Sequence, residues 1–170
     1  MNCDNKVTSE KSSKTGRVIL FPIDGSSHSE RAFRWYLDHM KHDDDSIKFI
    51  TVIESIYTAP AFEMALELPL LPDVSKIMKQ HIKIGKELCQ QCMQKAKLAN
   101  LCSQAFLYVD SKSGSTIVRS IADHKADVVI MANRGLGAVR RTFLGSVSDY
   151  VLHHSLKPTV IVPPCQNESN

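Results

Sequence analysis

Short runs of apolar residues alternate along the chain with longer segments in which apolar residues recur every three or four positions. The short runs are typical of buried β-strands, and the longer segments are typical of amphipathic helices. This alternation predicts βαβ units and a parallel sheet that is covered on both faces by helices. The predicted strands span 17–23, 47–53, 103–109, 127–132 and 159–162, and the predicted helices span 27–40, 73–100, 113–124 and 145–155.

The length of 170 residues predicts a single domain. Residues 1–15 are polar and rich in Ser and Lys, so we expect flexible tails at 1–15 and 165–170 around a domain at 16–164. The first segment lacks the apolar stretch of a secretory signal, and no apolar run is long enough to span a membrane. Five cysteines in such a chain predict reduced thiols and a cytoplasmic protein. The net charge of +3 gives little support for binding nucleic acid.

A glycine-containing loop follows the fourth predicted strand. It begins at Ala132, contains Gly135, and ends at Gly145 and Ser146, where the last predicted helix begins. Glycines allow backbone N–H groups to approach a ligand closely, and a helix N-terminus attracts phosphate, so this order predicts an anion site. The alternative is a tight turn with an ordinary helix start, because Ser146 and Asp149 have the spacing of a capping box.

Two further polar residues extend this hypothesis. Asp24 follows the first predicted strand, and ligands of parallel sheets bind at the carboxyl ends of the strands. Its carboxylate can accept a hydrogen bond from a ribose or a base, but Asp-Gly-Ser is also ordinary turn and N-cap chemistry. Among the basic loop residues, Arg134 is the expected neighbour of a phosphate.

Together these segments resemble the universal stress protein family. The resemblance rests on residues 22–26, on 126–131, and on the loop, which is similar to the family's G-x2-G-x9-G-[ST] nucleotide signature. Gly135, Gly145 and Ser146 fit the signature, whereas Ala132 replaces its first glycine. The resemblance implies a Rossmann-like α/β fold with an open, twisted, five-stranded parallel sheet of order 3-2-1-4-5.

The resemblance also implies a small stress-response protein that binds ATP, or ADP or AMP, and acts as a homodimeric sensor or regulator with an unidentified partner protein. We expect Mg²⁺ to be bound together with a triphosphate. The dimer is expected to form through the last strand, at Thr159, Val160, Ile161 and Val162. The implied nucleotide-binding residues are Pro22, Asp24, Val52, Ala132, Arg134, Gly135, Gly145, Ser146 and Val147.

The alanine at position 132 could affect the expected binding of a nucleotide. Alanine in place of glycine costs on the order of 1 kcal/mol where φ is positive. Ala132 ends a predicted strand, where we expect a negative φ, and alanine is the smallest substitute. We therefore expect weakened affinity at most.

Three other functions remain open. A slow ATPase or a related adenine-nucleotide enzyme is one, although no dedicated catalytic residue stands out. A nucleotide-free dimer is the second. A thiol switch through Cys89 and Cys92 is the third, but their helical spacing favours core packing. On the same reasoning we expect His81 to be a core histidine and neither His153 nor His154 to bind metal. The apolar segment 54–72 is either a lid, a partner surface or a short helix.

Overall fold

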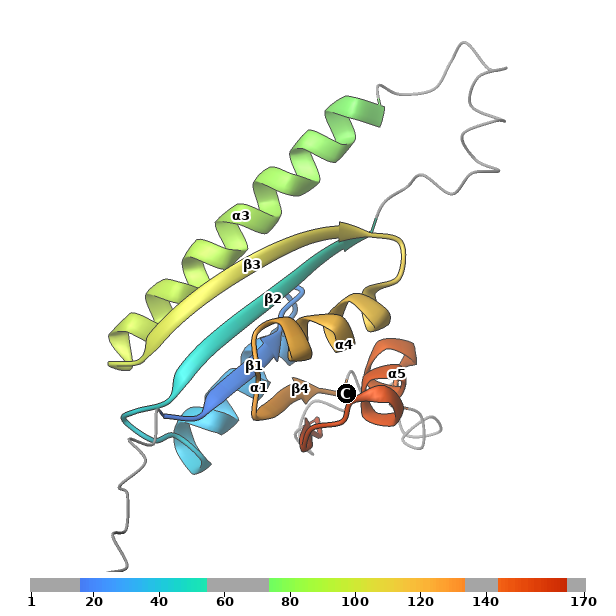
Figure 1. Ribbon diagram of the computed structural model, residues 1–170. Helices are drawn as coiled ribbons and strands as arrows, with labels where there is room; N and C mark the ends of the chain where they lie inside the picture. Colours follow the sequence, from blue (N-terminus) through green and yellow to red (C-terminus); the bar gives the residue numbers. More distant parts are fainter. Residues whose placement is uncertain (1–15, 55–73, 134–143, 165–170) are drawn as a thin grey trace, which may run out of the picture.

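Five parallel strands form a single sheet of order β3-β2-β1-β4-β5 in this computed structural model, which describes residues 16–54, 74–133 and 144–164 (Figure 1). This order confirms the expected fold. The strands are β1 (Val18–Pro22), β2 (Ser46–Glu54), β3 (Cys102–Asp110), β4 (Val128–Ala132) and β5 (Thr159–Val162). The helices are α1 (Ser27–His39), α3 (Val74–Leu98), α4 (Ser113–Asp123) and α5 (Ser146–His154). The first and last residues of each strand and helix lie within two residues of the predicted bounds.

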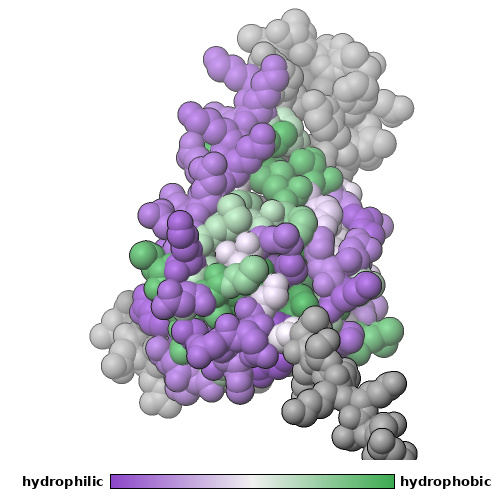
Figure 2. Space-filling model, turned by 60° about the vertical axis from the view of Figure 1, so that its left-hand side comes forward, coloured by the Kyte–Doolittle hydropathy of each residue, from purple (hydrophilic) through white to green (hydrophobic). Residues whose placement is uncertain are grey.

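Helices cover both faces of the sheet, which explains why the strands are almost continuously apolar. In β1, Ile19 and Phe21 point to one face and join a core with side chains of α1 and α3, such as Phe33. Leu20 points to the other face and packs with side chains of α4 and α5, such as Ile117. The central strand is therefore buried on both sides. On the outside, the face in Figure 2 is hydrophilic over most of its described area, with hydrophobic residues toward its middle.

Helix α3 lies close against the sheet at Gly85. A Cβ atom at this position would lie 2.5 Å from Cδ1 of Leu107 and 3.2 Å from Cδ1 of Ile53, so only a glycine fits without rearrangement. The expectation of a core histidine at position 81 was wrong, because His81 is exposed. His81 lies one turn before Gly85, toward the amino end of α3. Figure 1 shows that this end of the helix extends past the ends of the described strands.

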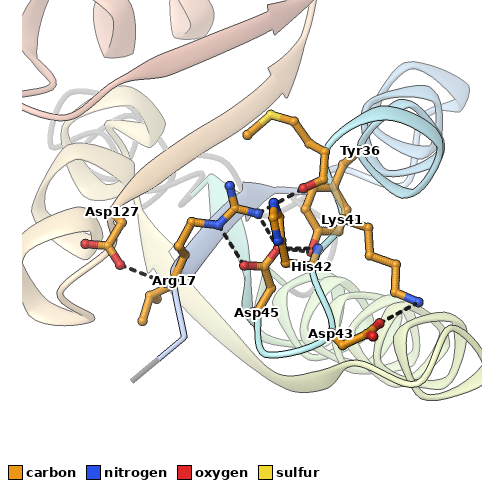
Figure 3. A network of polar contacts seen from close by, with 9 residues as sticks. Arg17, Tyr36, Lys41, His42, Asp43, Asp45 and Asp127 are labelled. Atoms are coloured by element: carbon orange, nitrogen blue, oxygen red, sulfur yellow. Dashed lines mark hydrogen bonds and ion pairs between the residues drawn. The ribbon is translucent and has the colours of Figure 1, made fainter. Parts of the chain in front are cut away.

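A partly buried ion pair joins the amino end of β1 to the start of β2, with the Asp45 side chain buried and the Arg17 side chain 37% exposed (Figure 3). The Nε and Nη2 atoms of Arg17 donate to the carboxylate of Asp45 at 2.8 and 2.7 Å. The Tyr36 hydroxyl and the His42 backbone N–H donate to Oδ2 of Asp45 at 2.7 and 3.0 Å. Burial by itself raises the pKa of Asp45, but these donors outweigh it and hold the pKa below its ordinary value. Asp45 is only 1% exposed, so the network holds the amino ends of β1 and β2 together.

Candidate functional site

A pocket of about 570 Å³ opens at the carboxyl ends of β1, β2 and β4, at the opposite end of the strands from the Arg17–Asp45 pair. Its volume lies within the ~300–1,000 Å³ typical of small-molecule sites. Its floor is apolar, and its rim carries hydroxyl, carboxylate and imidazole groups. This is the edge at which ligands of open parallel sheets bind.

Seven of the nine sequence-predicted site residues line this pocket. They are Pro22, Asp24, Val52, Ala132, Gly145, Ser146 and Val147. The other two, Arg134 and Gly135, lie outside the described residues, as does the segment 55–73. The structure therefore brings together residues from both ends of the proposed signature and from the first two strands.

Helix α5 begins at the pocket, and none of the residues that the structure describes caps it with a side chain. Its N-cap residue is Gly145, with φ 84° and ψ 143°, a backbone conformation that is essentially restricted to glycine. A Cβ at Gly145 would meet nothing within 4 Å. Ser146 is thus the first helical residue and not the N-cap, so the expected capping box with Asp149 was wrong. Within the described part of the chain, no side chain caps the first-turn N–H groups of α5, and uncapped N–H groups at a helix start can bind a ligand.

Asp24 organises the turn between β1 and α1. Its Oδ1 atom accepts hydrogen bonds from the backbone N–H of Ser26 at 3.0 Å and from the hydroxyl of Ser26. The Ser26 hydroxyl oxygen in turn accepts from the N–H of Ser29 at 3.3 Å and so caps α1. The turn interpretation of Asp24 is confirmed, and Ser26 rather than Asp24 is the N-cap. Because Asp24 also lines the pocket, this turn fixes the carboxylate at its rim.

Ala132 ends β4 in an ordinary strand conformation. It is paired with Val162 of β5, and its φ is not among the positive values of the described residues. Its methyl group packs against the core on the α1 side, and its carbonyl oxygen accepts a hydrogen bond from Ser148 at 3.4 Å. The expected negative φ is confirmed, so alanine introduces no backbone strain here.

The N-termini of three helices converge on the pocket. α1 contributes Ser26, His28 and Ser29, α4 contributes Ser113, and α5 contributes Gly145 and Ser146. Each N-terminus carries a partial positive charge, which favours an anionic ligand. Sequence reasoning had missed His28, Glu54, Ser113 and Asn133 as lining residues. Glu54 ends β2 and Ser113 begins α4, so the rule of strand carboxyl ends would have found both.

A chain of polar contacts connects α1 to the end of β4. The Nη1 atom of Arg31 lies 3.0 Å from Nδ1 of His28, and its Nη2 atom donates to the carbonyl oxygen of Asn133 at 2.6 Å. His28 and Asn133 both line the pocket. Arg31 thus brings a fixed positive charge close to the α5 side of the site.

Cys89 and Cys92 lie on the side of α3 that faces the core. Cys89 is 7% exposed, and its sulfur lies 3.6 Å from Oγ1 of Thr51. Burial raises the pKa of Cys92 to about 11, which disfavours a reactive thiolate. Both are free thiols, as core packing predicts. His153 and His154 are exposed, and the described residues contain no cluster of side chains able to hold a metal ion.

The comparisons with known proteins agree with this geometry. The universal stress protein family model matches residues 16–163. The chain belongs to the universal stress protein family. It is 27% identical over 153 residues to a universal stress protein of Mycolicibacterium smegmatis, covering 88% of this chain and 49% of that protein. The chain thus spans about half of the length of this curated relative.

Solved structures of universal stress proteins share this fold at lower identity. A family member from Arabidopsis thaliana with AMP bound has a TM-score of 0.64 and 19% identity, covering 91% of this chain and 95% of that chain. A universal stress protein in complex with cAMP has a TM-score of 0.62 and 18% identity, covering 87% of this chain and 97% of that chain. Among the helices that the structure describes, none combines the length and hydrophobicity needed to cross a membrane.

Proposed function

We propose that this universal stress protein binds an adenine nucleotide in the pocket at the carboxyl ends of its strands. The observation that carries the proposal is the start of α5, where Gly145 is the N-cap, no described side chain caps the first-turn N–H groups, and a pocket of suitable size opens. The AMP and cAMP complexes of structurally similar proteins support the choice of nucleotide.

The residues present fit such a ligand. The N-terminus of α5, at Gly145, Ser146 and Val147, would hold the phosphates through backbone N–H groups and the helix dipole. Asp24, fixed by Ser26, would accept a hydrogen bond from a ribose hydroxyl. Arg134 and Gly135 belong to the same proposal. Mg²⁺ would neutralise part of the charge of a triphosphate.

The role that follows is that of a sensor or regulator in a stress response, because the N-terminus of α5 offers a place for the phosphates of a nucleotide. His28 is the imidazole on the pocket rim, and it lies beside the Arg31 guanidinium, an arrangement suited to holding an anion. A slow ATPase remains the second candidate, and a nucleotide-free dimer is the third.

We also propose that two copies of the chain associate through β5. This strand lies at one edge of the sheet, and no strand of the described residues pairs with its outer side, where a further strand could add. Leu156 is 99% exposed just before β5, and Leu152 is 40% exposed on α5. These apolar side chains extend the strand edge into a surface that a second copy would cover.

The deciding experiment is calorimetric titration of the purified protein with ATP, ADP and AMP, each with and without Mg²⁺, after removal of any co-purified nucleotide. Saturable micromolar binding supports the proposal. The absence of binding up to millimolar nucleotide contradicts it and favours the nucleotide-free dimer.

A further inference from the structure

A second pocket, of about 200 Å³, lies between α1 and α3 on the face of the sheet that these two helices cover. Ile23, Phe33 and Phe49 line its inner side, and each is 7% exposed or less. Leu88 of α3 adds a half-buried apolar wall. The side chains of the described residues leave this space open, so it can take up a small apolar group.

The size and the lining of this pocket fit one aromatic ring with a short chain. A cavity of ~150 Å³ lined by Leu, Ile and Phe side chains is large enough to bind benzene. The rings of Phe33 and Phe49 have centroids 5.3 Å apart and an interplanar angle of 68°, and a third ring can pack edge-to-face or offset against such a pair. Cys92 also lines the pocket, and sulfur makes favourable contacts with aromatic rings.

The rim of the pocket carries a cation whose position is fixed. The Nζ atom of Lys95 on α3 donates to Oε1 of Glu30 on α1 at 2.5 Å, so the ion pair crosses from one helix to the other. An ammonium group has three donors, and Lys95 can therefore bind a second acceptor while it stays paired with Glu30. Arg34 lines the same pocket, so its described charged residues are two cations and one carboxylate. This rim favours an anionic group.

We propose that the pocket between α1 and α3 binds a small aromatic carboxylic acid, with the ring against Phe33 and Phe49 and the carboxylate at Lys95 and Arg34. The carboxylate accepts charge-assisted hydrogen bonds from these cations, and the ring leaves water for the apolar interior. An amine of the same shape places its ammonium group beside two cations and is disfavoured. The inference does not rest on nucleotide binding, because it concerns a different pocket.

The residues that distinguish the two pockets decide the design of the test. Ile23 and Ser29 line both pockets, so variants at these positions cannot separate the sites. Lys95 and Cys92 line the pocket between α1 and α3 and are absent from the lining of the larger pocket. They are therefore the positions to change.

The test compares three ligands of one shape by NMR titration at pH 7: 3-phenylpropionate, 3-phenylpropanol and 3-phenylpropylamine. They share the ring and the chain and differ in the charge of the end group. We expect a Kd on the order of 0.1–1 mM for the acid, which has about eleven non-hydrogen atoms. The alcohol is expected to bind about fivefold more weakly than the acid, and the amine more weakly still.

Two variants and a control locate the binding. Lys95→Gln removes the fixed cation and leaves Glu30 without this partner, so affinity for the acid falls about fivefold or more while affinity for the alcohol changes little. Cys92→Phe fills the pocket and weakens binding of all three ligands. Lys97→Gln, at an exposed lysine of the same helix outside the pocket lining, leaves every affinity at the wild-type value.

Thermal melts establish that each variant is folded, and Lys95→Gln supplies the measurement if Cys92→Phe is not. An acid that binds no more tightly than the alcohol overturns the choice of a carboxylate. Affinities that remain at the wild-type values in the folded variants overturn the assignment to this pocket. A wild-type protein that binds none of the three ligands at tenfold the expected Kd overturns the proposal as a whole, and the proposed nucleotide site is unaffected by that result.

Discussion

The Nη2 atom of Arg31 on α1 donates a hydrogen bond to the backbone carbonyl oxygen of Asn133, which directly follows β4. The distance of 2.6 Å and the charge of the donor make this a strong contact. It joins the helix that carries His28 to the strand end that precedes the glycine-containing loop. The contact thus connects two walls of the pocket that lie far apart in sequence.

Replacing this arginine is expected to weaken both the fold and the site. Arg31→Gln removes a charged donor from the Asn133 carbonyl, and we expect a loss of about 1.5–3 kcal/mol in the free energy of unfolding. Nucleotide affinity falls as well, because the two pocket walls lose their connection. Urea denaturation and calorimetry measure the two effects. Arg34→Gln, an exposed arginine on the same helix, is the control and leaves both values unchanged.

Gly145 is expected to tolerate no side chain. Gly145→Ala places an L-residue at φ 84° and ψ 143°, which costs about 1–3 kcal/mol of backbone strain even though its Cβ would meet no other atom. The start of α5 shifts to relieve the strain, and nucleotide affinity falls with it. A melting temperature and an affinity equal to those of the wild-type protein would contradict the proposed role of this helix start.

A substitution at Ala132, unlike one at Gly145, is expected to change nucleotide affinity little. Ala132→Gly restores the first glycine of the family signature, but the alanine already has an unstrained strand conformation. We expect nucleotide affinity to change by about threefold or less and stability to fall by about 0.5–1 kcal/mol, since glycine weakens a strand. An affinity gain of tenfold or more in calorimetry would show that the methyl group obstructs the ligand.

The buried Asp45 gives a prediction for acid stability. Its pKa is lower in the folded protein than in the unfolded chain, so its stabilisation is complete above about pH 4 and is lost as the pH falls further. Asp45→Asn removes the charged acceptor of the hydrogen bonds from Arg17, Tyr36 and His42, and we expect a loss of about 1.5–3 kcal/mol at pH 7. Denaturant titrations at pH 7 and pH 3 should show the gap between variant and wild type narrowing in acid. A gap that is equal at both pH values would be inconsistent with this assignment.

The dimer proposal is tested at the exposed leucine before β5. Leu156 is 99% exposed, so Leu156→Glu cannot disturb packing within the described part of the chain, but it places a charge on the proposed interface. We expect sedimentation to show a dimer for the wild-type protein and a monomer for the variant. Leu98→Glu, at an exposed leucine ending α3, serves as the control. A variant that sediments as the wild type does would place the interface elsewhere.

Much of the fold could be predicted from the sequence because the strands are buried on both faces and the helices carry regular apolar stripes. Cys89 is an example, since its helical spacing already favoured core packing and its side chain is 7% exposed. The strand order came from the family resemblance rather than from periodicity. His81 shows the limit, because periodicity cannot reveal where a helix extends past its sheet.

The site was predictable where it follows the family signature and less so elsewhere. Asp24 and Gly145 could be placed at the pocket from the sequence. The spacing of Ser146 and Asp149 suggested Ser146 as the N-cap, and it could not reveal the backbone conformation that makes Gly145 the N-cap. Glu54 enters the site because β2 lies beside β1. The rule of strand carboxyl ends finds it once that strand order is known, and the order came from the family resemblance.

The position of the Arg17–Asp45 pair has a consequence for how the sequence of this protein can evolve. It lies at the amino end of β1, while the pocket lies at the carboxyl end, and a strand of five residues separates them by about 16 Å. Substitutions more than ~10 Å apart without shared partners usually have additive effects. Selection can therefore adjust resistance to heat or acid at one end while ligand preference drifts at the other, and neither property constrains the other.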